Sequence, residues 1–195
     1  TIEELKILLE YAKAEIDAVH GDEINVKFND TNQPYLWSAE GIAILLKGAI
    51  GKEKGVPQLK INKSDNKIIV EKSAGQVRPF ISAFTAKGKK IDEYLLKQII
   101  QLQEKLCENY GRRRQKIAIG VYPTQKINFP LTYAAVAPDA VSFIPLGEHT
   151  AKTLKQILET HSKGKEYSWI LKNEKKYPIL IDAKKQVLSF PPIIN

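Results

Sequence analysis

Cysteine, methionine and histidine are scarce in this 195-residue sequence, which has one cysteine, no methionine and three histidines. A single cysteine cannot form an internal disulfide, and scattered histidines give no recognisable set of zinc ligands. No stretch approaches the roughly 20 apolar residues needed to span a bilayer. The N-terminus also lacks the pattern of a secretion signal. We therefore expect a soluble, cytoplasmic protein without disulfides, bound metal or membrane partner.

Glycine-rich nucleotide-binding loops are missing as well, since neither the P-loop nor the dinucleotide spacing follows an expected strand. This disfavours nucleotide hydrolysis and hydride transfer. His20, His149 and His161 lie beside expected helix ends or polar turns, and no pattern places them near a nucleophile. Cys107 falls beside an apolar helix stripe, where a small buried hydrophobe is more common than a reactive thiol. An independent metabolic enzyme is therefore the weakest of the alternatives.

Positive charge is concentrated in the second part of the chain. Residues 1–72 hold ten lysines and twelve acids, which gives −2, whereas residues 73–195 hold twenty Lys or Arg and ten acids, which gives +10. Such a concentration is typical of a module that binds a polyanion. A lysine-rich solvated surface is the alternative. Charge alone thus favours a nucleic-acid partner while leaving both interpretations open.

The first 72 residues predict a helix, a strand and a second helix. Thr1 and Glu4 have the spacing of a capping box, and apolar residues at three- and four-residue steps extend the expected helix through Ile16. We expect this helix to stop near Gly21. The alternating residues 23–29 predict a strand.

Further signals place the second helix and the domain boundary. Ser38 is the expected N-cap of the second helix. A stretch rich in Gly, Lys and Pro follows it, and residues 67–70 predict a short strand. We place the domain boundary near residue 72.

Strands and helices mix without strict alternation in the second part, which indicates an α+β fold. The expected strands cover residues 78–85, 116–121, 131–136, 142–145, 178–182 and 186–190, and the expected helices cover 91–110, 151–161 and 165–171.

Two features of the second part could serve a site. Gly111 is a natural residue to end the longest helix, and Arg112, Arg113 and Arg114 follow it. Their guanidinium groups could bind successive phosphates, or they could cap helix carbonyls and form ordinary surface. The segment 190–194 contains two prolines and must leave the sheet edge. Such an exit can form the floor of a pocket or can be a buried strand end.

Seven segments stand out by their order and spacing: DTNQPYLWS at 30–38, RPF at 78–80, IQLQEKL at 100–106, GRRR at 111–114, IAIG at 117–120, FIPL at 143–146 and VLSFPPIIN at 187–195. Together they resemble the beta subunit of archaeal and eukaryotic phenylalanyl-tRNA synthetase. The likeness covers nearly the whole chain, and several segments in register make a chance match improbable.

The resemblance implies a small helix–strand–helix N-terminal domain at 1–72 and a mixed sheet-and-helix editing domain at 73–195, incomplete at its C-terminal end. Such a domain hydrolyses tyrosine wrongly attached to phenylalanine tRNA. The ligase active site, with its ATP and Mg²⁺, is expected only in the parent synthetase, so we expect no cofactor here. The expected partners are tRNA and the alpha subunit. The alternative is a non-catalytic tRNA-binding or subunit-interface module.

The resemblance also implies where the site lies, although it assigns no catalytic group. The candidates for the editing pocket are Gly120, Val121, Tyr122, Leu188 and Asn195, and those for tRNA binding are Arg112, Arg113 and Arg114.

The chain departs from the family pattern at three places. The family's Asn-Arg-Pro-Asp is here NQPY at 32–35, which removes an opposite-charge pair. Where the family has an aromatic residue or histidine followed by acids, residues 122–125 read YPTQ. The family continues past PPIIN with a polar stretch that contains a glutamate associated with editing. We therefore expect no acidic contribution from residues 122–125, and we expect part of the pocket to lie beyond Asn195.

Overall fold

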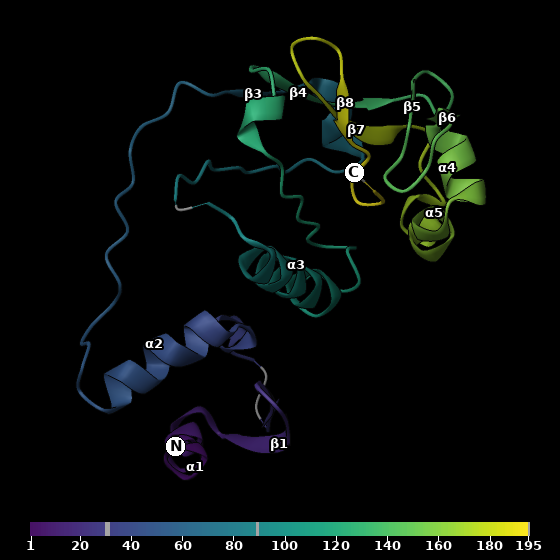
Figure 1. Ribbon diagram of the computed structural model, residues 1–195. Helices are drawn as coiled ribbons and strands as arrows, with labels where there is room; N and C mark the ends of the chain where they lie inside the picture. The colour runs from purple at the N-terminus through teal and green to yellow at the C-terminus, as the bar shows by residue number, and fades with distance from the viewer. Residues whose placement is uncertain (30–31, 89, 195) are drawn as a thin grey trace. The chain divides into compact units, whose positions relative to one another are not determined.

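The computed structural model describes residues 1–29, 32–88 and 90–194. These residues form two compact units, whose elements Figure 1 shows in chain order. Unit 1 contains residues 1–62 and 90–106, and unit 2 contains residues 63–89 and 107–195. Neither unit is one continuous stretch of chain. The domains expected at 1–72 and 73–195 stay a prediction.

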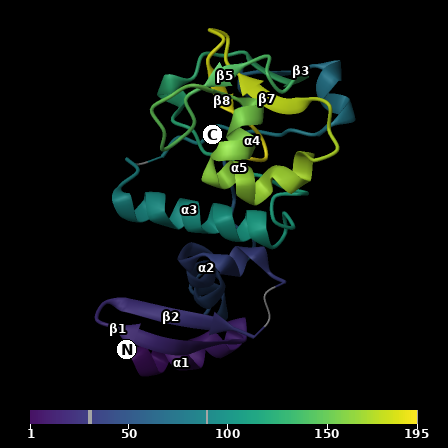
Figure 2. The same ribbon diagram turned by 90° about the vertical axis from the view of Figure 1, so that its right-hand side faces the viewer.

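Unit 1 packs helices around one β-hairpin, drawn in Figure 2. Strands β1 and β2 pair antiparallel, and a core of buried Leu9, Ala12, Ala14 and Leu36 joins the hairpin to α1, η1 and η2. The elements of the unit are α1 (Ile2–Leu9), the 3-10 helix η1 (Glu10–Ala12), β1 (Ala14–His20), β2 (Glu23–Phe28), η2 (Pro34–Trp37), α2 (Ala39–Ala49) and most of α3 (Glu93–Glu108).

The expected helix starts in unit 1 are confirmed. The Thr1 hydroxyl accepts from the Glu4 N–H at 3.2 Å, and the Glu4 carboxylate accepts from the Thr1 amino group at 2.7 Å. Ser38 caps α2 by accepting from the Gly41 N–H at 3.1 Å. Within the same unit, the Lys105 ammonium donates to the Trp37 carbonyl at 3.0 Å, which ties α3 to η2.

The expectation that the first helix continues through Ile16 is wrong. Helix α1 ends at Leu9, Lys13 adopts a left-handed conformation with φ 51°, and β1 begins at Ala14. Because Ile16 fits both a helical step and strand alternation, the local pattern does not decide between them. Pairing with β2 decides, and Gly21, with φ 59°, belongs to the hairpin turn instead of ending a helix.

Unit 2 contains a four-stranded mixed sheet of order β3-β4-β7-β8, in which only β3 and β4 are parallel. A two-stranded ribbon of β5 and β6 accompanies it. The α+β class is thus confirmed. The elements are β3 (Ile68–Val70), η3 (Lys72–Gln76), η4 (Thr124–Lys126), β4 (Leu131–Val136), β5 (Ser142–Phe143), β6 (Lys152–Thr153), α4 (Leu154–Thr160), α5 (Ser162–Tyr167), η5 (Ser168–Leu171), β7 (Tyr177–Ile181) and β8 (Val187–Ser189).

Both faces of this sheet carry apolar side chains. Alternation along β4 sends Tyr133 to one face and Ala134 to the other. Ala134 belongs to a core with Leu154 and Ile157 of α4 and with Tyr167 of α5. Tyr133 belongs to a second core, formed with residues of η3, β7 and β8. Strand β8 lies at the sheet edge, which leaves the chain after it available to shape a site.

Two expected strands, at 78–85 and 116–121, do not form. Both have suitable alternation, but a strand needs a partner for its backbone N–H and C=O groups, and neither segment pairs within the described part of the chain. Phe80 and Phe84 are each 90% exposed. The strand expected at 131–136 is confirmed with both its ends, and the other expected strands of unit 2 are confirmed with shifted or shortened ends. No helix among residues 1–29, 32–88 and 90–194 is long and apolar enough to cross a membrane.

A buried carboxylate fixes the β7–β8 turn. Asp182 is 2% exposed and accepts from the Asn128 side-chain amide at 2.7 Å. It also accepts from the backbone N–H groups of Lys184 and Gln186, both at 2.9 Å. The Asn128 hydrogen bond, followed by the backbone donors, lowers the pKa of Asp182 below its usual 3.8. This turn sets the register that leads into β8.

We expect Asp182→Asn to lower the urea midpoint of unfolding at pH 7. The new side-chain NH₂ group would face the N–H donors that the carboxylate now accepts from, and it could not accept their hydrogen bonds. The folded-state pKa lies below the unfolded value. The stabilisation is therefore present above about pH 4 and is lost as the pH falls through the folded pKa. The gap between wild type and variant should close on acidification. Asp65→Asn, at an exposed position, is the control. Equal midpoints for wild type and Asp182→Asn at pH 7 would contradict this role.

Candidate functional site

Residues predicted to border a pocket meet at the end of β8. The Tyr122 hydroxyl shares a hydrogen bond with the Ser189 side chain, next to Leu188, while burial raises the pKa of Tyr122. The Tyr122 ring lies so close over Gly120 that a Cβ at position 120 would collide with it. Leu188 packs half-buried beside the second core, and Val121 is 49% exposed. Gly120, Tyr122 and Leu188 thus lie in one region.

A tight turn follows β8, as the proline pair predicts. The Phe190 N–H donates to the Ile194 carbonyl at 2.7 Å, and the Ile193 N–H donates back to the Phe190 carbonyl at 2.8 Å. Phe190 and Ile193 are fully buried. The Ser189 hydroxyl also donates to the Ile194 carbonyl, at 3.5 Å. We call residues 190–194 the proline turn. The candidate Asn195 lies outside the described residues.

Three consecutive arginines form a left-handed turn after α3, which we call the arginine turn (residues 111–114). Arg112, Arg113 and Arg114 have φ values of 48°, 53° and 64°. Their backbone N–H groups cap the helix end by donating to the Asn109, Glu108 and Cys107 carbonyls at 3.1, 2.9 and 2.9 Å. The sequence left open whether these arginines cap the end of α3. Their backbone N–H groups make that cap.

Gly111 has a different role from the expected left-handed helix stop. Its φ is not positive; the left-handed conformation begins one residue later, at Arg112. A Cβ at position 111 would instead collide with the backbone carbonyls of Cys107 and Ile117. Gly111 is required by this close approach of two backbone segments.

Arg114 links the arginine turn to the proline turn. Its guanidinium donates to the Ile193 carbonyl at 2.9 Å and to the Pro192 carbonyl at 3.5 Å. The same group lies 4.3 Å from the centre of the Tyr167 ring. The Tyr167 hydroxyl donates to Glu108 at 2.9 Å, and burial together with this carboxylate raises the pKa of Tyr167. Arg114 is thus engaged by protein groups, whereas Arg112 and Arg113 are exposed.

Arg78 supports the arginine turn from the other side. Its guanidinium donates to the Gln115 carbonyl at 3.0 Å and to the Arg114 carbonyl at 3.1 Å, and burial lowers its pKa. The Tyr133 hydroxyl donates to the Arg78 carbonyl at 2.9 Å. Sequence analysis missed this role and those of Tyr167 and Ser189. These contacts join residues far apart in the chain, so no local pattern predicts them. The RPF segment at 78–80 stood out only as part of the resemblance to the family.

The remaining titratable candidates do not assemble into a site. His161 is buried and caps α5, with Nδ1 accepting from the Lys163 N–H at 3.1 Å. His20 and His149 are exposed. Cys107 is 3% exposed and burial raises its pKa, which confirms a buried hydrophobe. Within residues 1–29, 32–88 and 90–194, no group of three or more His, Cys, Asp or Glu side chains could hold a metal ion.

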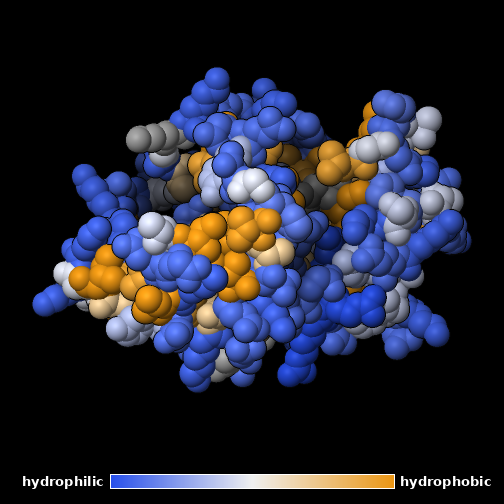
Figure 3. Space-filling view, turned by 60° about the horizontal axis from the view of Figure 1, so that its bottom comes forward, coloured by the Kyte–Doolittle hydropathy of each residue, from blue (hydrophilic) through white to orange (hydrophobic). Residues whose placement is uncertain are grey.

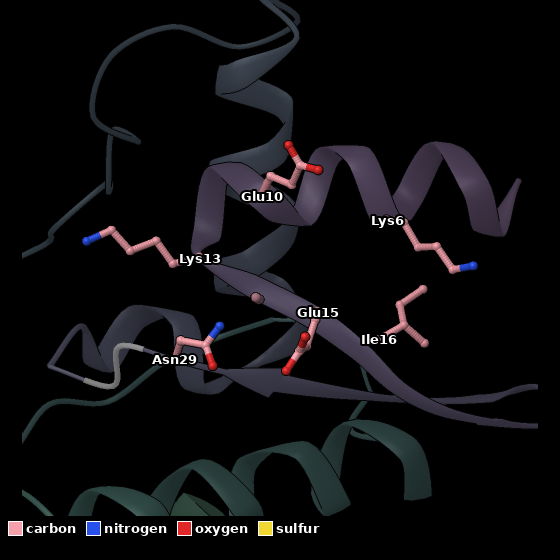
Figure 4. Close-up of a pocket in the computed structure, with 7 residues that line it drawn as sticks. Lys6, Glu10, Lys13, Glu15, Ile16 and Asn29 are labelled. Carbon is pink, nitrogen blue, oxygen red and sulfur yellow. The ribbon is translucent and has the colours of Figure 1, made fainter.

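A shallow hollow of about 500 Å³ lies in unit 1, between α1 and the hairpin. In Figure 4, Lys6 and Lys13 extend to opposite sides of it, with Glu10 above and Glu15 and Asn29 below. Its charges balance, and every candidate pocket residue lies instead in unit 2. The hollow therefore contributes nothing to the site at β8.

We expect Arg114→Ala to destabilise the fold by about 2–3 kcal/mol, because it removes a charged hydrogen bond and leaves the Ile193 carbonyl unpaired. The neighbouring control Arg112→Ala should change stability by less than about 0.5 kcal/mol, since its side chain is exposed. Urea denaturation of both variants measures the difference. Equal effects would show that Arg114 does not secure the proline turn.

Comparison with known proteins gives one consistent group of relatives, although no family model matches the chain. Phenylalanine–tRNA ligase beta subunits from Pyrococcus furiosus and Pyrococcus horikoshii are 42% and 44% identical to it over 199 residues, and the one from Borrelia turicatae is 45% identical over 205 residues. Each alignment covers 100% of this chain and 36% of the relative. The chain thus spans about a third of their length.

A solved structure agrees with these relatives. The crystal structure of an N-terminal fragment of the phenylalanyl-tRNA synthetase beta subunit from Pyrococcus horikoshii superposes with a TM-score of 0.92 at 41% identity. The match covers 100% of this chain and 57% of the crystallised one.

These relatives are subunits of aminoacyl-tRNA synthetases. The chain belongs to the family of archaeal-type phenylalanyl-tRNA synthetase beta subunits and matches their N-terminal part along its whole length. The resemblance seen in the sequence is thereby confirmed.

Proposed function

We propose that this chain forms part of an editing site that hydrolyses tyrosine wrongly attached to phenylalanine tRNA. The observation that carries the proposal is the convergence of Gly120, Tyr122, Leu188 and the proline turn in a chain of this family. The parent protein would be a phenylalanyl-tRNA synthetase with tRNA and an alpha subunit as its partners. Its ATP- and Mg²⁺-dependent ligation would take place outside this chain.

The proposed reaction needs positioning more than unusual chemistry. A water oxygen bonds to the ester carbonyl carbon and the ester C–O bond breaks. One water proton goes to the ribose oxygen, which stays on the tRNA as a hydroxyl, and the other is released to solvent as tyrosine leaves as its carboxylate. Holding the ester in place converts this into an effectively unimolecular step. The proline turn suits that role because Arg114 and its own backbone hydrogen bonds hold it in one conformation.

Discrimination requires a partner for the tyrosine hydroxyl. A site that pairs a substrate hydroxyl rejects the analogue that lacks it, because its own polar groups are then left unpaired. The Tyr122 and Ser189 hydroxyls lie next to Leu188, and burial raises the pKa of Tyr122. We assign these two hydroxyls to recognition of the tyrosyl side chain, with Leu188 against its ring.

The pocket assignment is tested by Leu188→Ala combined with Asn195→Ala in the beta subunit assembled with its alpha partner. We expect deacylation of tyrosyl-tRNA(Phe) to slow at least about tenfold, or about 1.4 kcal/mol in the barrier. Phenylalanine ligation should continue, which reports that the assembly is folded. The control is Leu59→Ala with Asn66→Ala, both exposed. Wild-type deacylation by the pocket variant would remove both residues from the mechanism.

The recognition role is tested separately by Tyr122→Phe, which removes one oxygen and keeps the ring over Gly120. We expect the preference for tyrosyl-tRNA over phenylalanyl-tRNA in deacylation to fall about tenfold or more, since a paired hydroxyl dominates such discrimination. Rates with both substrates give the ratio. If the ratio stays at the wild-type value, the phenol has no part in selecting tyrosine.

A non-catalytic subunit-interface module is the second candidate function. Ile7, Tyr11, Ile44 and Ile50 of unit 1 are large apolar side chains that are 45–64% exposed. Figure 3 shows hydrophobic side chains gathered on one face among hydrophilic ones. This candidate is favoured if alpha–beta assembly requires these side chains and the assembled wild-type enzyme does not deacylate tyrosyl-tRNA(Phe).

A further inference from the structure

A basic surface that includes the exposed Trp169 ring lies where the arginine turn meets α5 and η5. Arg114 packs over the Tyr167 ring, and Arg113 lies 6.0 Å from the centre of the Trp169 ring. These contacts bring two stretches of unit 2 together that are far apart in the sequence. The surface is therefore built by the fold and is not visible as a motif.

Positive charge dominates both stretches. Residues 108–116 hold four cations and one acid, and residues 162–176 hold five cations and two acids, so nine cations face three acids. Two of the acids are already engaged, since Glu166 pairs with Lys163 at 2.9 Å and Glu108 accepts a tyrosine hydroxyl. The charge that remains suits an anionic partner.

Three exposed groups lie close together in the chain at α5 and η5. Lys165 is on α5, Trp169 follows it by four residues on η5, and Lys172 is the C-cap of η5. All three are exposed. In the part of the chain that the structure describes, neither lysine nor Arg113 forms an ion pair. They are free to bind phosphate.

Packing does not account for Trp169. Its neighbours Tyr167 and Leu171 are each 3% exposed and hold the helix on the core, whereas Trp169 is 42% exposed. Arg113, at 6.0 Å, is at the outer limit of a cation–π contact, so its guanidinium is not held as that of Arg114 is at 4.3 Å. A partly exposed indole beside cations that form no ion pair suits a nucleobase with its phosphates.

We propose that Arg112, Arg113, Lys165, Trp169 and Lys172 bind the unpaired 3′ end of a tRNA. A base stacks on the Trp169 indole, and the cations pair with the flanking phosphates. The inference rests on the proposed function, which requires an aminoacylated 3′ end to reach the proline turn.

Chain geometry links the two sites. Arg114 contacts the proline turn at the Ile193 carbonyl, and its neighbour Arg113 faces Trp169. The proposed RNA surface therefore adjoins the proposed pocket, and a strand that crosses it would deliver its terminal ester to the end of β8. Tryptophan and arginine are also common in protein interfaces, but there charged residues are depleted from the centre. The excess of cations favours RNA over a protein partner.

The kinetic test uses Arg113→Ala with Trp169→Ala in the assembled synthetase and follows tyrosyl-tRNA(Phe) deacylation at several salt concentrations. Loss of one stacked base and one phosphate contact should raise KM about tenfold with kcat unchanged. The log–log dependence on salt should become shallower by about 0.7. The matched control, Phe84→Ala with Lys184→Ala, also removes one exposed ring and one exposed cation of unit 2. It should behave as wild type.

A second measurement separates failure of this surface from failure of the proposed function. A photoreactive benzoylphenylalanine in place of Trp169 is irradiated with uncharged tRNA(Phe). Crosslinks to the tRNA 3′ end support the surface, even if the wild-type assembly does not deacylate and the editing proposal falls. Crosslinks to the alpha subunit overturn it. If the wild-type enzyme deacylates tyrosyl-tRNA(Phe) and the double variant has the same KM and the same salt dependence, the proposed surface is also overturned.

Discussion

The contact between the Arg114 guanidinium and the carbonyls of the proline turn is the interaction on which the site depends. Strand β8 lies at the edge of its sheet, so the chain after Ser189 has no further strand to hold it. The 2.9 Å bond to the Ile193 carbonyl supplies that support from another segment. Tyr167 and Arg78 in turn fix Arg114, one through its ring and the other through the backbone. A network of side chains therefore fixes the position of the proline turn.

The backbone of the arginine turn carries a cost that these contacts offset. An L-residue in the left-handed region costs roughly 1–2 kcal/mol, and three such residues stand in a row at 112–114. Non-glycine residues persist there when the surroundings over-determine them, which is common near functional sites. Here three N–H groups cap α3 while one guanidinium reaches the proline turn. The same conformation directs Arg113 toward Trp169, so one strained turn serves both proposed sites.

Local signals predicted local structure well. The caps at Thr1 and Ser38 follow from side chains that satisfy helix N–H groups within three residues, and the strand at 131–136 follows from its apolar pattern. The sequence predicted the wrong element where the choice depended on pairing with another segment. Ile16 fits a helix or a strand until β2 pairs with β1.

The candidate site also depends on contacts that the local sequence does not predict. The proline pair alone predicted that the chain leaves the sheet, but nothing local predicts that Arg114 reaches a carbonyl 79 positions away. Charge counting located a basic half of the chain without showing which cations are free. The structure separates Arg114, whose guanidinium donates to two carbonyls of the proline turn, from Arg112 and Arg113, whose side chains are exposed. Such a division arises only from tertiary contacts, because the three residues are chemically identical.

The interleaved order of the two units along the chain affects how the protein folds during synthesis on the ribosome. Unit 1 contains residues 90–106 as well as residues 1–62, and unit 2 begins with residues 63–89. The buried core of unit 1, made of Leu9, Ala12, Ala14 and Leu36, therefore leaves the exit tunnel first. Helix α3, whose Lys105 donates to the Trp37 carbonyl, joins the unit only after the intervening stretch has been made. A shortened gene that stops near residue 72 would encode this core without α3.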